Sequence, residues 1–134
     1  KCIGDAIMVL FGAPQDMSPS EQAAQATECA KAMQVTMGSF TKNWEDDGAS
    51  HLKMRIGIHH GQAVVGNFGS TQRSDYTAIG PAVNFASRIE SASSAGEVFV
   101  SEAVAGLLDT HVTEAVGAFD LKGIDGAQTL YRVG

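Results

Sequence analysis

The stretch that decides the fold is KCIGDAIMVLFGAP, residues 1–14. In it, an apolar run of strand type follows the pair Gly4–Asp5 and stops at Phe11-Gly12-Ala13-Pro14. Gly-Asp between strand-like runs predicts a hairpin, because both residues tolerate tight turns. The turn would hold the Asp5 carboxylate at a rigid tip, four residues after Lys1, and such a tip suits metal and phosphate chemistry. Taken alone, the stretch favours a simpler alternative, a surface hairpin with a solvated aspartate.

Length and composition limit the possible functions. The chain has 134 residues, 44% of them hydrophobic, which predicts one domain with a real core over residues 1–134. Its formal net charge is −6 with nine Lys and Arg residues, so we expect no nucleic-acid partner, although a few converging cations could bind an anionic substrate. Cys2 and Cys29 form no CxxC pair, which is typical of reduced, cytoplasmic thiols. The apolar runs are too short to span a bilayer, so no direct membrane insertion is expected.

A long helix follows the opening hairpin. Ser18-Pro19-Ser20-Glu21 has an N-cap serine, a proline at the first helical position and a glutamate three residues after the serine, which together predict a helix start. The helix is expected from about Pro19 to about Glu45. Its apolar positions step by four and three and form one stripe, which we interpret as core. The stripe consists of Ala26, Ala30, Met33, Met37, Phe40 and Trp44.

Next, the pattern predicts a second hairpin, in which a strand over Lys53–His60 turns at Gly61–Gln62 into a strand over Ala63–Phe68. His59 and His60 would then end the first strand. Because adjacent strand residues face opposite ways, they are not expected to share a metal ion.

The rest of the chain alternates short strands and helices. We expect strands over residues 76–79, 98–100, 112–121 and 129–133, a helix from Pro81 to a stop at residues 93–96, and a short helix over residues 101–108. The segment before residue 76, from Gly69 to Asp75, is polar and loop-like. Hairpins combined with long helices predict an α+β fold, with the helices on one face of the sheet.

Four residues are candidates for chemistry. Asn84 and Arg88 are four apart and therefore share a helix face. Arg55 lies in the expected strand, and Lys122 lies in the turn over residues 122–126. Each alone could be an ordinary surface residue, so the interpretation depends on their order and spacing.

The order and spacing resemble those of the catalytic domain of class III nucleotidyl cyclases, the adenylyl and guanylyl cyclases. The resemblance covers nearly the whole chain and implies a ferredoxin-like cyclase fold, a mostly antiparallel sheet with helices packed on it. The matching runs are Lys1-x-x-Gly4-Asp5, Phe11-Gly12-x-Pro14, Arg55-Ile56-Gly57-Ile58-His59-x-Gly61, Val65-Gly66-Asn67-x-Gly69, Arg73-x-Asp75-Tyr76-Thr77-x-Ile79-Gly80, Val83-Asn84-x-Ala86-Ser87-Arg88-Ile89-Glu90, Leu121-Lys122-Gly123 and Tyr131-Arg132-Val133.

The resemblance implies conversion of ATP to cyclic AMP and pyrophosphate, with two Mg²⁺ or Mn²⁺ ions assisting attack of the ribose 3′-hydroxyl on the α-phosphate. Asp5 resembles the second of two metal-binding aspartates. The first lies in an upstream strand of the family that this sequence lacks. Because the chain begins inside a strand-like pattern, we expect a domain without its first strand and helices, which would be inactive alone and would follow an upstream sensor or regulatory domain.

Other roles follow from the matching positions. Lys1 resembles the lysine that reads the base, and Thr77 stands where many relatives have an aspartate that reads adenine, as in a threonine-type subclass. Asn84 resembles the residue that orients the ribose, and Arg88 the arginine that stabilises charge on the α-phosphate. Arg55 and Lys122 resemble the family's cations that bind the triphosphate. Gly80-Pro81 replaces a common Gly-Asp pair, and proline suits a helix start there.

The resemblance also implies a cytoplasmic head-to-tail homodimer with its sites at the interface. Asp5 and Arg55 would face one site, and the other five residues would face the site related to it by the twofold axis. The alternatives are a guanylyl cyclase, which Thr77 leaves open, and a non-catalytic dimerisation or regulatory module of the same fold. A ferredoxin-like binding domain unrelated to cyclases is a further alternative.

Overall fold

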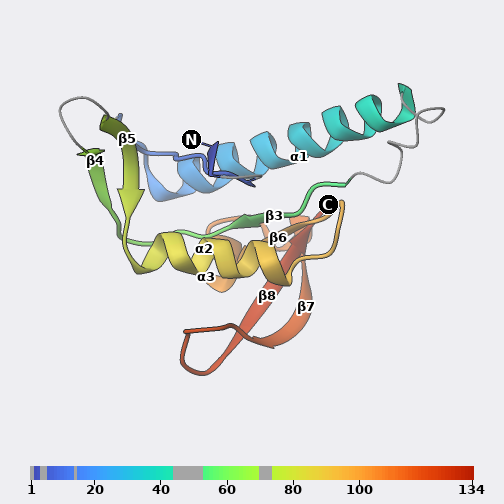
Figure 1. The fold of residues 1–134 in the computed structure, drawn as a ribbon. Helices are drawn as coiled ribbons and strands as arrows, with labels where there is room; N and C mark the ends of the chain where they lie inside the picture. Colours follow the sequence, from blue (N-terminus) through green and yellow to red (C-terminus); the bar gives the residue numbers. More distant parts are fainter. Residues whose placement is uncertain (1, 4–5, 14, 44–52, 70–73) are drawn as a thin grey trace.

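A computed structural model describes residues 2–3, 6–13, 15–43, 53–69 and 74–134 (Figure 1). Within these ranges, three helices and eight strands follow one another, with a 3₁₀ turn over Thr110–Val112. The elements are β1 (Cys2–Ile3), β2 (Ala6–Ile7), α1 (Pro19–Asn43), β3 (Ile56–Ile58), β4 (Val64–Gly69), β5 (Ser74–Ile79), α2 (Pro81–Ala92), β6 (Val98–Ser101), α3 (Glu102–Ala105), β7 (Thr113–Asp120) and β8 (Ala127–Val133).

A four-stranded sheet forms the centre, in the order β3-β6-β8-β7. β3 pairs with β6 in parallel, with Ile56 opposite Val98, whereas β6–β8 and β7–β8 are antiparallel. The sheet is therefore mixed but mostly antiparallel, as expected for the predicted α+β class. A register shift between Ala115 and Gly117 interrupts β7.

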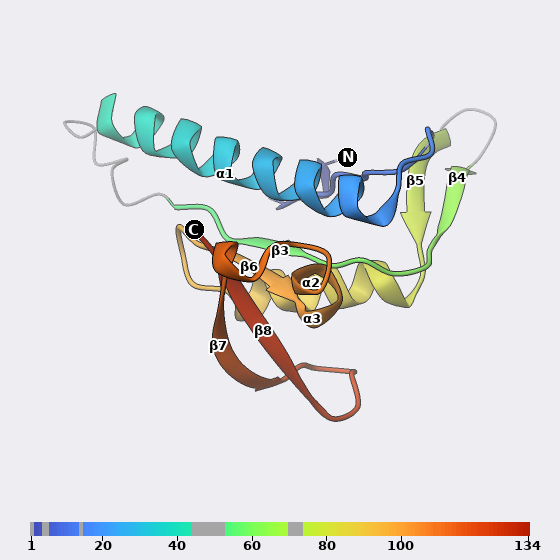
Figure 2. The ribbon, with the colours of Figure 1, turned by 180° about the vertical axis from the view of Figure 1, so that it is seen from behind.

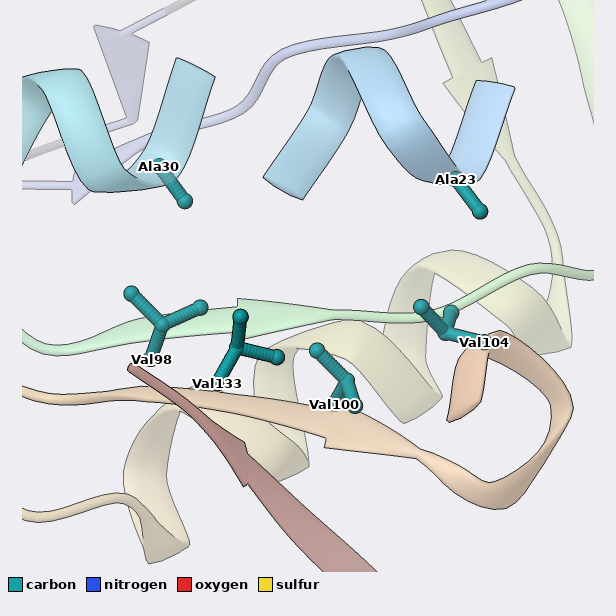
Figure 3. Packing of buried hydrophobic residues seen from close by; sticks show 6 residues of the cluster. All are labelled: Ala23, Ala30, Val98, Val100, Val104 and Val133. Carbon is teal, nitrogen blue, oxygen red and sulfur yellow. The ribbon is translucent and has the colours of Figure 1, made fainter. Parts of the chain in front are cut away.

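Helices cover both faces of this sheet, so the prediction of helices on one face was wrong. Side chains alternate along β6: Val98 and Val100 join a buried cluster with Ala23 and Ala30 of α1, whereas Phe99 joins a second cluster with Ile89 of α2. Figures 1 and 2 show α1 and α2 on opposite sides of β3 and β6. Figure 3 shows the alanines of α1 above the valines of the sheet.

α1 begins as predicted, because the Ser18 hydroxyl accepts a hydrogen bond from the Glu21 amide at 3.2 Å. Its buried seam differs from the predicted stripe. Ala23, Thr27 and Ala30 are each 3% exposed, whereas Phe40 is 50% exposed. The small residues face the sheet and let the helix approach it closely.

The larger residues of the predicted stripe instead border an open apolar hollow. It measures about 310 Å³ and is lined by Cys29, Ala32, Met33, Thr36, Met37, Phe40 and Met54. Trp44 lies outside the described residues. Among the helices of the described ranges, none combines the length and the apolar character that a bilayer crossing needs.

Two short ribbons stand apart from the central sheet. β1 and β2 pair antiparallel, with Ile3 opposite Ala6, which confirms the opening hairpin although Gly4 and Asp5 themselves lie outside the described residues. β4 pairs with β5. The predicted hairpin between residues 53–60 and 63–68 was therefore wrong, because β3 pairs with β6 instead.

Candidate functional site

Four of the predicted site residues lie on or near α2, which packs directly on β3: Arg55, Asn84, Arg88 and Lys122. A Cβ atom at Gly57 would lie 2.4 Å from the Glu90 nitrogen and 2.8 Å from the Ala86 oxygen, so only glycine fits between strand and helix. Ile56 and Ile58 point the other way, into the cluster below α1. By strand alternation, Arg55 and His59 share the α2 side with Gly57.

Asn84 and Arg88 are held by α2 on one face of the helix, as predicted. Pro81 occupies the first helical position, which confirms the predicted start, and Gly80 precedes it with a φ of 135°. Asn84 is exposed, Arg88 is half-buried, and Ile89 next to it is fully buried. Burial of Ile89 therefore fixes how the helix is rotated about its axis. In this orientation Asn84 and Arg88 lie next to the face of α2 that packs on the sheet.

Lys122 lies next to residues that pack in the same buried cluster as Ile89 of α2. Leu121 and Ile124, which flank it in the turn between β7 and β8, belong to the buried cluster of Ile89. The Lys122 side chain itself is exposed. Arg88 and Lys122 thus each adjoin a member of one cluster, so the structure brings their backbones to the same side of the molecule.

Arg55 lies at the opposite end of α2 from Asn84. The His59 ring lies beside Phe85, and Gly57 lies beside Ala86 and Glu90, so β3 runs antiparallel to the helix. Arg55, two residues before Gly57, therefore falls near the helix end, and its side chain is exposed. One chain does not join Arg55 and Asn84 in a single site.

Thr77 lies on β5, opposite Gly66 of β4, in the strand that leads into α2. It is 5% exposed, so little of it reaches solvent in the single chain.

The described cations differ in their partners, and Lys53 shares the lack of an ion pair with the cations near α2. Arg132 pairs with Glu114 at 2.8 Å and with Glu97 at 3.2 Å. Arg55, Arg88 and Lys122 form no ion pair with any other described residue. In a chain of net charge −6, unpaired cations beside one helix favour an anionic ligand.

The remaining two predicted site residues, Lys1 and Asp5, lie outside the described residues. Within the described ranges, no group of three or more His, Cys, Asp or Glu side chains could hold a metal ion. The described residues alone therefore do not fit a complete metal site.

The sequence did not predict that the His59 side chain connects two elements of the fold. Its ring stacks on Phe85 with centroids 4.1 Å apart and planes at 11°, and its Nδ1 lies 2.8 Å from Ser101 Oγ. Burial, with a smaller contribution from the charge of His60, lowers the pKa of His59 below its usual 6.5. A hollow of about 380 Å³ opens beside it, lined by His59, Gly61, Gln62, Pro81, Ala82 and Phe85. The alternation with Gly57 could have placed His59 on α2, but the expected hairpin put it at a turn.

Comparison with known proteins identifies similar chains. The family model described as the adenylate and guanylate cyclase catalytic domain matches residues 1–133. Adenylate cyclase 1 of Rhizobium meliloti (strain 1021) is 37% identical over 87 residues, which cover 65% of this chain and 13% of that protein. An adenylate cyclase of Anabaena cylindrica is 32% identical over 147 residues, covering 99% of this chain and 27% of that protein. The chain thus spans less than a third of the length of either relative.

Solved structures agree with the family model. The adenylyl cyclase CyaB from P. aeruginosa has a TM-score of 0.86 at 36% identity, and the match covers 100% of this chain and 69% of that chain. The guanylyl cyclase Cya2 has a TM-score of 0.86 at 32% identity, covering 99% of this chain and 67% of that chain. These similarities confirm the predicted cyclase fold.

Proposed function

This chain belongs to the adenylate and guanylate cyclase catalytic domain family, and from that premise we propose that it converts ATP to 3′,5′-cyclic AMP and pyrophosphate. In this reaction the ribose 3′-oxygen forms a bond to the α-phosphorus, the bond from that phosphorus to the pyrophosphate oxygen breaks, and the 3′-hydroxyl loses its proton. The observation that carries the proposal is that three cations around α2, namely Arg55, Arg88 and Lys122, form no ion pair with another described residue, because a triphosphate needs such groups.

Asn84 and Arg88 would act on the reacting atoms. Their shared face on α2 suits a division of labour, in which Asn84 orients the ribose and Arg88 stabilises the charge that develops on the α-phosphate. Lys122, beside the same buried cluster, would bind the outgoing phosphates.

Lys1 and Thr77 would read the base. A threonine hydroxyl can accept from the adenine amino group or donate to a carbonyl, so it discriminates less sharply than a carboxylate. The equal TM-scores for an adenylyl and a guanylyl cyclase make GTP the second candidate substrate.

Two divalent ions, Mg²⁺ or Mn²⁺, would bind at Asp5 together with an aspartate from outside these residues. When bound, such ions lower the pKa of the attacking hydroxyl and offset the triphosphate charge. This chain's own part would be to hold the nucleotide with Arg55, Arg88 and Lys122.

The partner would be a second copy of the chain, bound partly through β4 and β5. Val64 and Ile79 lie opposite each other on this ribbon and are 62% and 50% exposed. A two-stranded ribbon is marginally stable by itself, so a partner that covers this apolar pair would stabilise it. The separation of Arg55 from Asn84 along α2 supports the assignment of these two residues to different sites of a symmetric dimer.

An upstream strand would complete the sheet beside β3. Among the described strands β3 pairs only with β6, although helices cover both faces at this position. An open edge inside the molecule is a natural place for another strand. A sensor or regulatory domain would precede that strand, and the domain would act in the cytoplasm.

The test uses the full-length protein with ATP or GTP and Mg²⁺ or Mn²⁺, and follows cyclic nucleotide. We expect cyclic AMP from the wild type and from Asp16→Asn, an exposed acidic control, but none from Asp5→Asn. Undiminished product from Asp5→Asn would refute the metal assignment. A folded wild type that produces neither cyclic nucleotide would contradict the enzymatic proposal and favour a non-catalytic module.

A further inference from the structure

We propose that His59 is a positioning residue for the cyclase reaction: its neutral imidazole, fixed by Ser101 and stacked on Phe85, holds α2 and thereby Asn84 and Arg88. The inference rests on the proposed function for the roles of those two residues. Its structural part rests on the contacts of His59 alone.

The hydrogen bonds at Ser101 define the state of the imidazole. Ser101 is 2% exposed, and its Oγ accepts a hydrogen bond from the Val104 amide at 3.3 Å. The buried hydroxyl proton needs an acceptor, since an unsatisfied buried donor is costly, and His59 Nδ1 lies 2.8 Å away. Ser101 therefore donates to Nδ1, and the ring carries its own proton on Nε2.

The stacked ring connects this hydrogen bond to the helix. Phe85 directly follows Asn84 in α2. The plane of its ring makes an angle of 11° with that of the imidazole, so the two rings are nearly parallel. A Cβ atom at Gly61 would lie 3.2 Å from His59 Nε2 and 3.0 Å from Ala82 Cβ. The imidazole thus lies against Ser101, Phe85 and Gly61, with the hollow open beside it, so its position and that of the helix start depend on each other.

Protonation would break this arrangement. An imidazolium must donate from Nδ1, which turns Ser101 Oγ into an acceptor and leaves the buried hydroxyl proton without a partner. The groups that contact the ring from α2 and β6, Phe85 and Ser101, do not titrate in this range. Charged residues on the packed elements are Arg88 and Glu90 on α2 and Glu102 on α3. Besides burial, the charge of His60 lowers the pKa of His59.

The sign of the pH effect follows from burial. Because the pKa of His59 is lowered from 6.5, the native state resists protonation, and the arrangement is complete above that pH. It is lost as the pH falls below 6.5 and through the lowered value. A kcat limb at acid pH should therefore contain a contribution from His59.

The experiment compares full-length wild type, His59→Ala, His59→Asn and the neighbouring control His60→Asn. Asparagine can place an oxygen near the position of Nδ1 without titrating there. For His59→Ala we expect kcat to fall about 10-fold with little change in KM, because slight misplacement of reacting groups is costly. His59→Asn should restore much of kcat at pH 7.5 and reduce the acid limb. His60→Asn should keep the wild-type kcat at pH 7.5, and its acid limb should move to higher pH because the charge of His60 no longer lowers the pKa of His59.

Hydrogen–deuterium exchange provides a readout that does not require activity. His59→Ala should raise exchange in α2 selectively, leaving β7 and β8 protected. Unchanged kcat and unchanged α2 exchange would overturn the proposal, and so would a rise in exchange that is uniform across the chain. If the wild type forms no cyclic nucleotide, the proposed function fails, and α2 exchange alone then decides whether His59 holds the helix.

Discussion

At the scale of the residue, Arg88 is the side chain on which the proposed reaction depends most. It is half-buried on α2, adjoins the fully buried Ile89 and forms no ion pair with a described residue. The helix fixes the backbone of Arg88, and no described carboxylate neutralises its guanidinium. In the proposed reaction this group would stabilise charge that appears in the transition state.

Replacing Arg88 by alanine should lower kcat by about 10²- to 10³-fold, the usual cost of removing one group that stabilises transition-state charge. Lys31→Ala is the control, since Lys31 lies on α1 at the other face of the sheet and contacts Glu28 at 3.9 Å. Initial rates of cyclic nucleotide formation measure both variants. Equal rates for Arg88→Ala and wild type would remove Arg88 from the mechanism.

Sequence reasoning at this scale succeeded where spacing alone decides the geometry. Asn84 and Arg88 were placed on one helix face because they are four apart, and the structure agrees. The approach of Lys122 to α2 depends on burial of Leu121 with Ile89, which are 32 positions apart, so only the family resemblance suggested it. His59 was misjudged because its contacts, Phe85 and Ser101, come from two distant elements.

At the scale of the element, the contact between β3 and α2 positions the site. Its closest point is Gly57, where strand and helix leave no room for a Cβ atom. Any side chain there must push the helix away from the sheet.

Gly57→Ala should lower the free energy of unfolding by about 1–3 kcal/mol, as overpacking does in tight cores, and should also reduce kcat. Gly38→Ala is the matched control in α1, where a Cβ atom would meet nothing within 4 Å. It should gain about 0.5–1 kcal/mol from the better helix propensity of alanine. Chemical denaturation compares the two, and a Gly57→Ala protein as stable as wild type would contradict the described contact.

The exposed apolar pair on β4 and β5 gives a second prediction for an element. Val64→Asp should raise the Kd of the homodimer at least about 10-fold, because burying an unpaired charge costs more than the roughly 1.4 kcal/mol that a tenfold change represents. Val116→Asp on β7, 41% exposed, is the control. Analytical ultracentrifugation measures both, and an unchanged Kd for Val64→Asp would place the interface elsewhere.

Elements were predicted better than their pairing. The starts of α1 and α2 followed from Pro19 and Pro81, which both occupy the first turn. The predicted pairing of β3 was wrong because the turn signal at Gly61–Gln62 indicates only a neighbour in sequence. The strand that pairs with β3 is β6, which begins far along the chain at Val98. The predicted buried stripe of α1 was wrong, because Ala30 belongs to two rows of residues at helical spacing. The row with small side chains, Ala23 and Thr27, faces the sheet, and the row with the methionines does not.

At the scale of the whole molecule, Arg55, Arg88 and Lys122 form no ion pair with another described residue, and in the proposed dimer the two ends of α2 would belong to different sites. Arg55 lies near one end of α2 and Asn84 near the other, so one chain would not bring the proposed nucleotide-binding groups together. Two copies in a symmetric dimer would supply two equal sites, each with residues from both chains. The proposed reaction depends on this division of the site between two chains.

Mixing two defective full-length chains tests it most directly. Asp5→Ala and Arg88→Ala should each be inactive alone, since every site in either homodimer lacks one required group. After subunit exchange, half of the dimers would be mixed and would carry one intact site in two, so the account predicts about one quarter of wild-type cyclic nucleotide formation. No recovery on mixing, in a sample where mixed dimers are demonstrated, would contradict the shared site.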